Sequence, residues 1–170
     1  IAVPHLRRMP GALWQVPQQL RNSWYVLFFQ LRGVAEVALR RGDFGLIERL
    51  WRDWSPGWSV PEEEMRLLKR TFRQPGVLKA ALRYYRALAD PITKAAGESR
   101  RLAFSPIQVP TLAITGERDG CMDTRLFDEV MLGADFPRGL KVRRIREAGH
   151  FVHQEQPEEV NQRVLEWLRR

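Results

Sequence analysis

The sequence predicts an α/β fold in which a helical part is followed by the strand–helix–strand–helix end of a parallel sheet. Residues 10 to about 90 carry apolar side chains at helical spacing, whereas residues 105–170 alternate short apolar runs with helical stretches. Hydrophobic residues make up 44% of the 170, which is enough for a buried core. Two strands cannot form such a sheet alone, so we expect this sequence to be part of a longer chain.

The first part is expected to contain four helices punctuated by Gly and Pro. The opening apolar run is stopped by Pro4 and predicts the end of a core strand over residues 1–9. A helix is expected from Pro17 to about Leu31, with Gly33 as its left-handed C-cap. The other three are expected over residues 34–54 with an interruption near Gly42, over 62–74, and over 77–89. We therefore assign residues 10–104 to a helical cap and its linker, the linker covering about 90–108.

The second part, residues 105–170, reads as the C-terminal end of the sheet. Residues 109–116 form a continuous apolar, β-branched run, as in a strand buried on both faces. The expected order is then a helix over 124–132, a strand over 140–145, a loop over 147–150 and a helix from Pro157 to Leu168.

Charge and cysteine content narrow the function classes. The formal net charge is +8, and the excess lies in residues 1–104, which hold 18 basic and 9 acidic side chains. These basic residues stand at helical spacing in runs of at most two, which indicates solvated helix faces and no nucleic-acid partner. The single cysteine, Cys121, excludes an internal disulfide and favours a reducing, cytoplasmic location. No apolar run reaches the roughly 18 residues that a membrane span needs.

The loops after the two strands carry the chemistry. Asp119 follows the first strand and His150 follows the second, and parallel strands bring their carboxyl ends to one edge of a sheet. A carboxylate that holds one imidazole nitrogen fixes the tautomer and leaves the other nitrogen to take a proton. Glycines beside both residues are expected to permit the tight turns that such a meeting requires. From spacing alone, a purely structural Asp and His would be equally acceptable.

The amino-acid sequence of these segments closely resembles the C-terminal end of α/β-hydrolases. The matching stretches are VPTLAITGERD, ending at Asp119, and AGHF around His150, with Glu155, Pro157, Val160 and Asn161 downstream. The resemblance implies an α/β-hydrolase fold, with Asp119 as the triad acid and His150 as the triad base. Asp123 is a nearby alternative acid, but its position suits the start of the following helix better.

The helical part is similar to the lid of soluble epoxide hydrolases. Residues 22–36 look like the first lid helix, where a lid tyrosine five residues before the Gln of a Phe-Gln pair falls on Tyr25. An aromatic-Tyr-Arg motif at residues 84–86 places the second lid tyrosine on Tyr85, with Tyr84 as the alternative. The resemblance implies epoxide hydrolysis through an alkyl-enzyme ester, with the two phenols as donors to the epoxide oxygen. No residue here matches the nucleophile's motif, so the nucleophilic Asp is expected upstream, in the N-terminal half of the same enzyme.

A small apolar epoxide is the expected substrate, and Trp24, Phe28, Met122 and Phe151 are the candidate binding residues. We expect no cofactor and no metal, and the oligomeric state stays open. A catalytic role for Cys121 and a metal site at His150, His153, Glu147 and Glu155 are less favoured interpretations. A Ser nucleophile upstream would indicate an esterase, and halide-binding Trp donors would indicate a haloalkane dehalogenase. A non-catalytic helical binding module is the alternative from another class.

Overall fold

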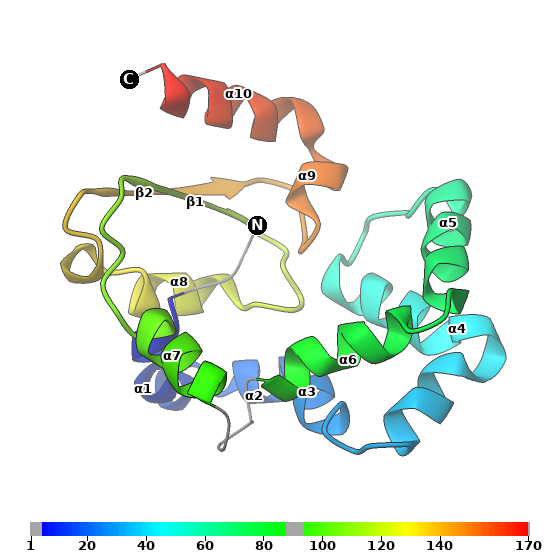
Figure 1. The fold of residues 1–170 in the computed structure, drawn as a ribbon. Coiled ribbons are helices and arrows are strands. Elements are labelled where there is room, and N and C mark those ends of the chain that lie inside the picture. Colours follow the sequence, from blue (N-terminus) through cyan, green and yellow to red (C-terminus); the bar gives the residue numbers. More distant parts are fainter. Residues whose placement is uncertain (1–4, 88–93, 170) are drawn as a thin grey trace.

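The computed structural model describes residues 5–87 and 94–169 (Figure 1). The strand end expected over residues 1–9 falls partly on residues 1–4, which lie outside the described residues. The rest of that expectation is wrong, because Leu6–Arg8 forms the 3-10 turn η1 and Met9–Gln15 forms helix α1. His5 caps η1 by accepting the N–H of Arg7 at 3.1 Å.

The sheet consists of two parallel strands, β1 (Thr111–Gly116) and β2 (Leu140–Ile145). Their register runs from Thr111 opposite Leu140 to Gly116 opposite Ile145. Helix α8 (Thr124–Val130) lies on one side of the sheet, and α9 (Val152–Glu155) and α10 (Pro157–Leu168) lie on the other (Figure 1). We call β1 to α10 the sheet unit; its two strands and its final helix are where the sequence predicts them.

Alternation along β1 explains its continuous apolar run. Ile114 packs with Ile145 and Val160 on the side of α10. Ala113 packs with Phe127 of α8 on the opposite side. Because both faces are covered, the successive side chains Leu112, Ala113 and Ile114 are all apolar, as in a strand of a buried parallel sheet.

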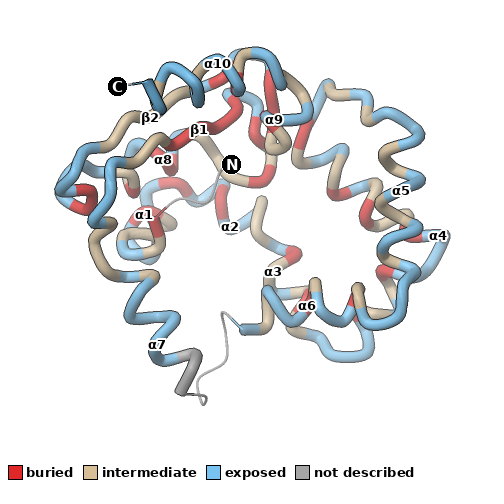
Figure 2. Tube along the Cα trace, turned by 45° about the horizontal axis from the view of Figure 1, so that its top comes forward, coloured by how far each residue is buried: buried red, intermediate tan, exposed pale blue. Residues whose placement is uncertain are grey.

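Five further helices form a second part around their own apolar core (Figures 1 and 2). We call this part the helical unit; it comprises α2 (Gln18–Asn22), α3 (Trp24–Phe28), α4 (Val34–Trp54), α5 (Glu62–Arg73) and α6 (Val77–Ala87). Its core includes Tyr25, Phe29, Leu39, Phe44, Ile47, Leu50, Leu78 and Leu82, together with Cys121 from the sheet unit.

The helical unit bends the chain more than the sequence predicts. The single helix expected from Pro17 to Leu31 is broken at Ser23, whose φ of −90° and ψ of 10° separate α2 from α3. Gly33 has the expected positive φ, +80°, but it is the N-cap of α4 and not the C-cap of the preceding helix. Its N–H donates to Glu36 at 2.8 Å, which closes the start of α4.

The interruption expected near Gly42 is confirmed. Gly42, Asp43 and Phe44 all have positive φ, so α4 contains a kink that turns Phe44 into the core. Phe44 packs on Phe72 of α5 with ring centroids 6.0 Å apart. Lys69 and Arg73 of the same helix pair with the Asp43 carboxylate and hold the kink from outside.

Two further segments differ from expectation. The stretch expected as a linker over 90–108 contains helix α7 (Lys94–Ala103). Helix α1 packs on α8 of the sheet unit, with Ala12 and Val16 against Leu126 and Val130.

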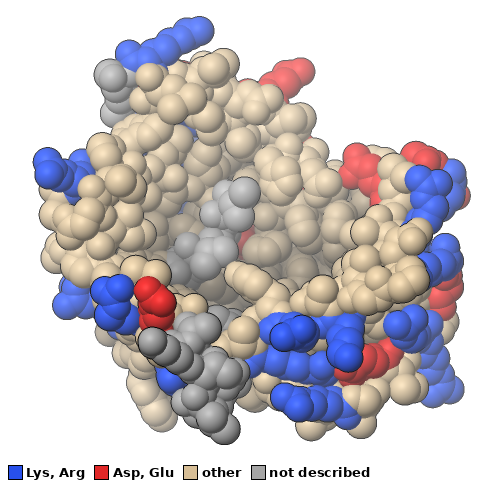
Figure 3. Space-filling model, viewed as in Figure 1, with Lys and Arg blue, Asp and Glu red and all other residues tan. Residues whose placement is uncertain are grey.

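In the view of Figure 3, basic side chains gather over the helical unit, and others are scattered over the sheet unit. Within residues 5–87 and 94–169, the helices are all too short or too polar to cross a membrane.

Candidate active site

The loop after β1 holds Asp119 by backbone hydrogen bonds. Its Oδ1 accepts the N–H groups of Cys121 and Met122, both at 2.8 Å, and its side chain is fully buried. A buried carboxylate needs such donors because it has lost water. Asp123, the alternative acid, instead caps α8 by accepting the N–H of Arg125 at 3.0 Å, and it also pairs with the Arg125 side chain. The geometry therefore places Asp119, and not Asp123, at the histidine.

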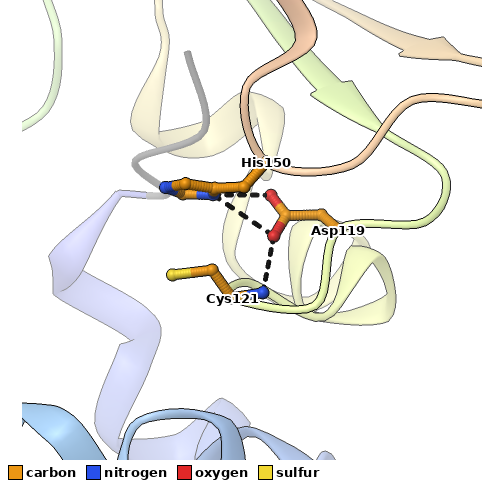
Figure 4. Close-up of side chains that lie close together, drawn as sticks. All are labelled: Asp119, Cys121 and His150. Carbon is orange, nitrogen blue, oxygen red and sulfur yellow. Dashed lines mark hydrogen bonds and ion pairs between the residues drawn. The ribbon is translucent and has the colours of Figure 1, made fainter. Parts of the chain in front are cut away.

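His150 meets Asp119 from the loop after β2 (Figure 4). Its Nδ1 lies 3.0 Å from Oδ2 and 3.2 Å from Oδ1, so Nδ1–H donates to the carboxylate. Burial lowers the pKa of His150, but hydrogen bonds to Asp119 and Cys121 outweigh burial and raise that pKa to about 10. The pair therefore stabilises an imidazolium at this position.

The loops after β1 and β2 require glycine because other backbone atoms approach them closely, and not because of a positive φ. A Cβ on Gly116 would lie 2.1 Å from the carbonyl oxygen of Gly149, and one on Gly120 would lie 2.1 Å from that of Asp53. A Cβ on Gly149 would lie 2.5 Å from the Cα of Ser55. None of the three has a positive φ. The glycines let the loops and the end of α4 pack backbone to backbone, which brings Asp119 and His150 together.

Tyr25 and Tyr85 lie next to each other in the helical unit. Their ring centroids are 5.7 Å apart in an edge-to-face arrangement, and the Tyr25 hydroxyl lies 3.2 Å from Cys121 Sγ. Burial raises the pKa of both phenols, to about 12 for Tyr85 and further for Tyr25. Both therefore remain protonated hydrogen-bond donors at neutral pH. Tyr84, the alternative second tyrosine, is 66% exposed on the outside of α6.

Gln30, Glu36 and Arg86, to which the sequence analysis gave no role, tie together the segments that carry these tyrosines. Arg86 donates to the carbonyl oxygen of Phe29 at 2.9 Å and to both Glu36 oxygens at 2.7 and 3.1 Å. Its hydrogen bonds lower the pKa of Glu36 to about 2. Gln30 donates to the carbonyl oxygen of Tyr85 at 3.3 Å. Gln30 and Arg86, which belong to the two lid motifs, therefore join the segments around α3, α4 and α6. Their fixed spacing from the tyrosines was the sequence signal that could have identified them.

The helical unit contains an apolar cavity of about 260 Å³. Tyr85 and Trp54 lie at its wall, and the other lining residues include Phe29, Leu50, Trp51, Phe72 and Leu82. The four predicted binding residues do not line it. Trp24 packs on Phe28 with centroids 5.7 Å apart, Phe151 stacks on Trp51 at 4.1 Å, and Met122 packs at the edge of the core. Trp51 links Phe151 to the cavity, whereas Trp24 is 40% exposed.

Asp119, Cys121 and His150 are the described residues whose donor atoms come close enough to hold a cation, all within 4.8 Å of one another. Thiolate, imidazole and carboxylate are ligands that zinc accepts. Here, however, the carboxylate already accepts three N–H groups and the thiol contacts the Tyr25 hydroxyl. The less favoured metal set is not assembled, because Glu147 pairs with Arg118 and His153 is exposed. In this structure the carboxylate and the thiol are therefore engaged with protein groups.

Comparison with known proteins finds epoxide hydrolases among the relatives. The chain is 31% identical over 167 residues to Epoxide hydrolase 2 of Caenorhabditis elegans, covering 94% of this chain and 43% of that protein. It is 29% identical over 171 residues to the AB hydrolase superfamily protein YfhM of Bacillus subtilis, covering 99% of this chain and 56% of the relative. The chain thus spans about half the length of the curated relatives it matches. No family model matches it.

Solved structures agree on the fold. A Klebsiella pneumoniae protein assigned as an epoxide hydrolase aligns with a TM-score of 0.73 and 25% identity, over 88% of this chain and 50% of that one. A haloalkane dehalogenase from Bradyrhizobium elkanii aligns with a TM-score of 0.62 and 19% identity, over 84% of this chain and 47% of that one. The second likeness shows the fold alone. Together with the β1–β2 sheet and its helices, these alignments confirm the predicted α/β-hydrolase fold class.

Proposed function

Because the chain is epoxide hydrolase-like and carries part of the α/β-hydrolase fold, we propose that it contributes to hydrolysis of an epoxide to a vicinal diol. The observation that carries the proposal is the meeting of two pairs. The Asp119–His150 pair lies in the loops that follow the two strands, and the Tyr25–Tyr85 pair lies in the helical unit. Cys121 connects the pairs, because its Sγ contacts the Tyr25 hydroxyl and its N–H donates to Asp119. In this proposal the helical unit is the cap, and residues 105–170 belong to the hydrolase core.

In the first step a carboxylate nucleophile on a segment outside this sequence attacks an epoxide carbon. The carbon–oxygen bond breaks, an alkyl-enzyme ester forms, and the alkoxide takes a proton from a tyrosine. Two phenols suit this step because the leaving oxygen remains tethered and its developing charge needs donors. The raised pKa values of Tyr25 and Tyr85 keep their protons available for donation.

In the second step the neutral form of His150, which becomes more abundant as the pH approaches its pKa of about 10, removes a proton from water through Nε2, and the hydroxide attacks the ester carbonyl. Asp119 holds Nδ1 in the donating tautomer and stabilises the imidazolium that forms. The ester is cleaved at its acyl carbon, and the departing diol oxygen takes the proton of the new carboxylic acid, which regenerates the carboxylate. The imidazolium returns its proton to the tyrosinate, so that histidine and tyrosine are regenerated as well.

The apolar cavity beside Tyr85 supports a small apolar epoxide as substrate. A hydrocarbon or aryl substituent can enter a wall of Leu, Phe and Trp side chains, whereas a charged substituent would lose water there without a partner.

The test compares the protein expressed from its complete gene with the 170-residue chain, both incubated with styrene oxide. We expect diol from the complete protein and none from the chain. Absence of diol with hydrolysis of a p-nitrophenyl ester would instead indicate an esterase. Diol formed by the chain alone would contradict the placement of the nucleophile outside it.

A further inference from the structure

The end of helix α4 touches both loops of the Asp119–His150 pair. The carbonyl oxygen of Trp54 accepts the N–H of Gly120 at 2.9 Å and the N–H of His150 at 3.1 Å. Gly120 adjoins Asp119 in the chain, so one carbonyl joins the backbones of both loops. The Trp54 ring also lies 5.4 Å from the His150 ring and 4.9 Å from the Tyr25 ring, centroid to centroid.

Ser55 and Glu155 complete this contact by surrounding three successive N–H groups. The Ser55 hydroxyl donates to Glu155 Oε1 at 2.7 Å, and its oxygen accepts the N–H of His150 at 2.9 Å. Glu155 accepts the N–H of Gly149 at 2.7 Å through Oε2 and that of Phe151 at 2.9 Å through Oε1. A concave run of backbone N–H groups is a preferred seat for a carboxylate.

The Ser55 side of this contact is shielded from water. Ser55 is 1% exposed, and its Cα and side chain pack against Gly149 so closely that a Cβ on Gly149 would overlap them. Loss of the hydroxyl would therefore leave one buried bond of the His150 N–H unmade or distorted. The residues come from two distant parts of the chain: the end of α4, and the loop after β2 with the helix α9 that follows it directly.

We propose that Ser55 and Glu155 are positioning residues that hold the His150 loop so that the imidazole Nδ1 stays on Asp119. We call them the Ser55–Glu155 clamp. Neither residue touches the imidazole ring by a hydrogen bond; both act through the backbone on each side of it. Because Ser55 ends α4, the clamp also ties the wall of the apolar cavity, through Trp51 and Trp54, to the placement of the histidine. Its role in turnover rests on the proposed function, whereas its effect on the Asp119–His150 bond does not.

The decisive measurement is nitrogen-15 and proton NMR of the histidine rings in the 170-residue chain. The chain holds three histidines, so the His150 signals can be assigned by His150→Gln. In the wild-type chain we expect an Nδ1 proton shifted far downfield and slow to exchange, because it is shared with a buried carboxylate. Ser55→Ala and Glu155→Gln should each speed its exchange about tenfold and lower the pKa of His150 by about one unit. Asp119 and Cys121 are the titratable groups facing the ring, and both stay in place in these variants.

Two matched variants act as controls. Ser59→Ala removes an exposed hydroxyl from the same α4–α5 connection, and Glu158→Gln removes an exposed carboxylate from α10. Neither should change the His150 signals. If Ser55→Ala does not fold, Glu155→Gln carries the test, because it keeps the shape of the side chain. Folded clamp variants with unchanged His150 exchange and pKa would overturn the proposal and leave Ser55 and Glu155 as a structural tie.

A kinetic readout extends the test to the complete protein. A displaced His150 should lower kcat for styrene oxide about tenfold with little change in KM, since the substrate would still bind in the apolar cavity. A rise in KM with unchanged kcat would contradict a positioning role. If the complete protein forms no diol at all, the proposed function fails, while the NMR result still decides the clamp.

Discussion

The two units of this molecule hold their functional side chains by different forces. In the sheet unit, Asp119 and His150 are held by backbone N–H groups and by one shared carbonyl, each at about 3 Å. In the helical unit, Tyr25 and Tyr85 are held by packing of aromatic rings, with hydrogen bonds only to sulfur or through Arg86 and Gln30. Directional bonds suit the proton shuttle that we propose, whose geometry must not vary, and apolar packing suits Tyr85, which borders the apolar cavity.

The largest expected effect is on the sheet unit. In the complete protein, His150→Gln should reduce diol formation by about 10³-fold or more while the alkyl-enzyme ester accumulates, because the base for hydrolysis is lost. Intact-mass measurement after addition of styrene oxide would show the added mass of one epoxide. Loss of turnover without any adduct would mean that His150 is needed for the first step, contrary to the proposed mechanism.

The tyrosines of the helical unit should control formation of the alkyl-enzyme ester, the step before its hydrolysis. Replacing both phenols, Tyr25→Phe with Tyr85→Phe, should slow formation of the ester about 10²- to 10³-fold, because the alkoxide loses its donors. Single-turnover kinetics would measure this step. Tyr84→Phe on the outside of α6 is the matched control and should leave the rate unchanged. Full activity in the double variant would remove the tyrosines from the mechanism.

Gly116 in the sheet unit is closely packed against another loop, whereas Gly11 in helix α1 faces open space. Gly116→Ala should destabilise the fold by about 3 kcal/mol or more, because the added Cβ would overlap the Gly149 carbonyl. Gly11→Ala, where a Cβ in helix α1 meets nothing within 4 Å, should be neutral or stabilise by about 0.5–1 kcal/mol. Urea unfolding of the two variants gives the comparison. Equal effects would mean that the loops around Asp119 and His150 are not packed as described.

The Asp119–His150 pair should make stability depend on pH. The pKa of His150 is about 10 in the folded chain and near 6.5 when unfolded, so its contribution is fully present below about pH 6.5 and is lost as pH rises toward 10. We expect the free energy of unfolding to fall over this range by on the order of a few kcal/mol. Asp119→Asn should flatten the curve, as followed by urea unfolding at several pH values. A wild-type curve that is already flat would contradict the charged pair.

The smallest expected effect concerns the polar link of the helical unit. Arg86→Lys should cost about 1–2 kcal/mol, because a lysine cannot donate to Glu36 and to the Phe29 carbonyl in the same fork. Arg83→Lys, an exposed position on the same helix, provides the control in thermal unfolding. Equal melting temperatures for the two variants would show that aromatic packing alone holds α6.

Most of the sheet unit could be predicted from the sequence because its signals are local. An apolar β-branched run predicted β1, and a Pro before an apolar helical stripe predicted α10. The helical unit was harder. Its apolar spacing continues across Ser23 and hides the break between α2 and α3, and the helix α7 begins inside a segment that Pro and Gly had marked as a linker.

The sequence by itself determined the strand–helix–strand–helix order of the sheet unit, the kink near Gly42 and the candidates Asp119, His150, Tyr25 and Tyr85. The tertiary structure decided which of those candidates meet, at which nitrogen, and what holds them. Ser55, Gln30 and Arg86 lie far along the chain from the groups that they support, Glu155 lies within six residues of the N–H groups that it binds, and the bonds of all four run mainly to backbone atoms. Backbone donors and acceptors are the same in every residue, so their pairing leaves no periodicity or motif to read. Only the folded packing of α4 on the two loops specifies it.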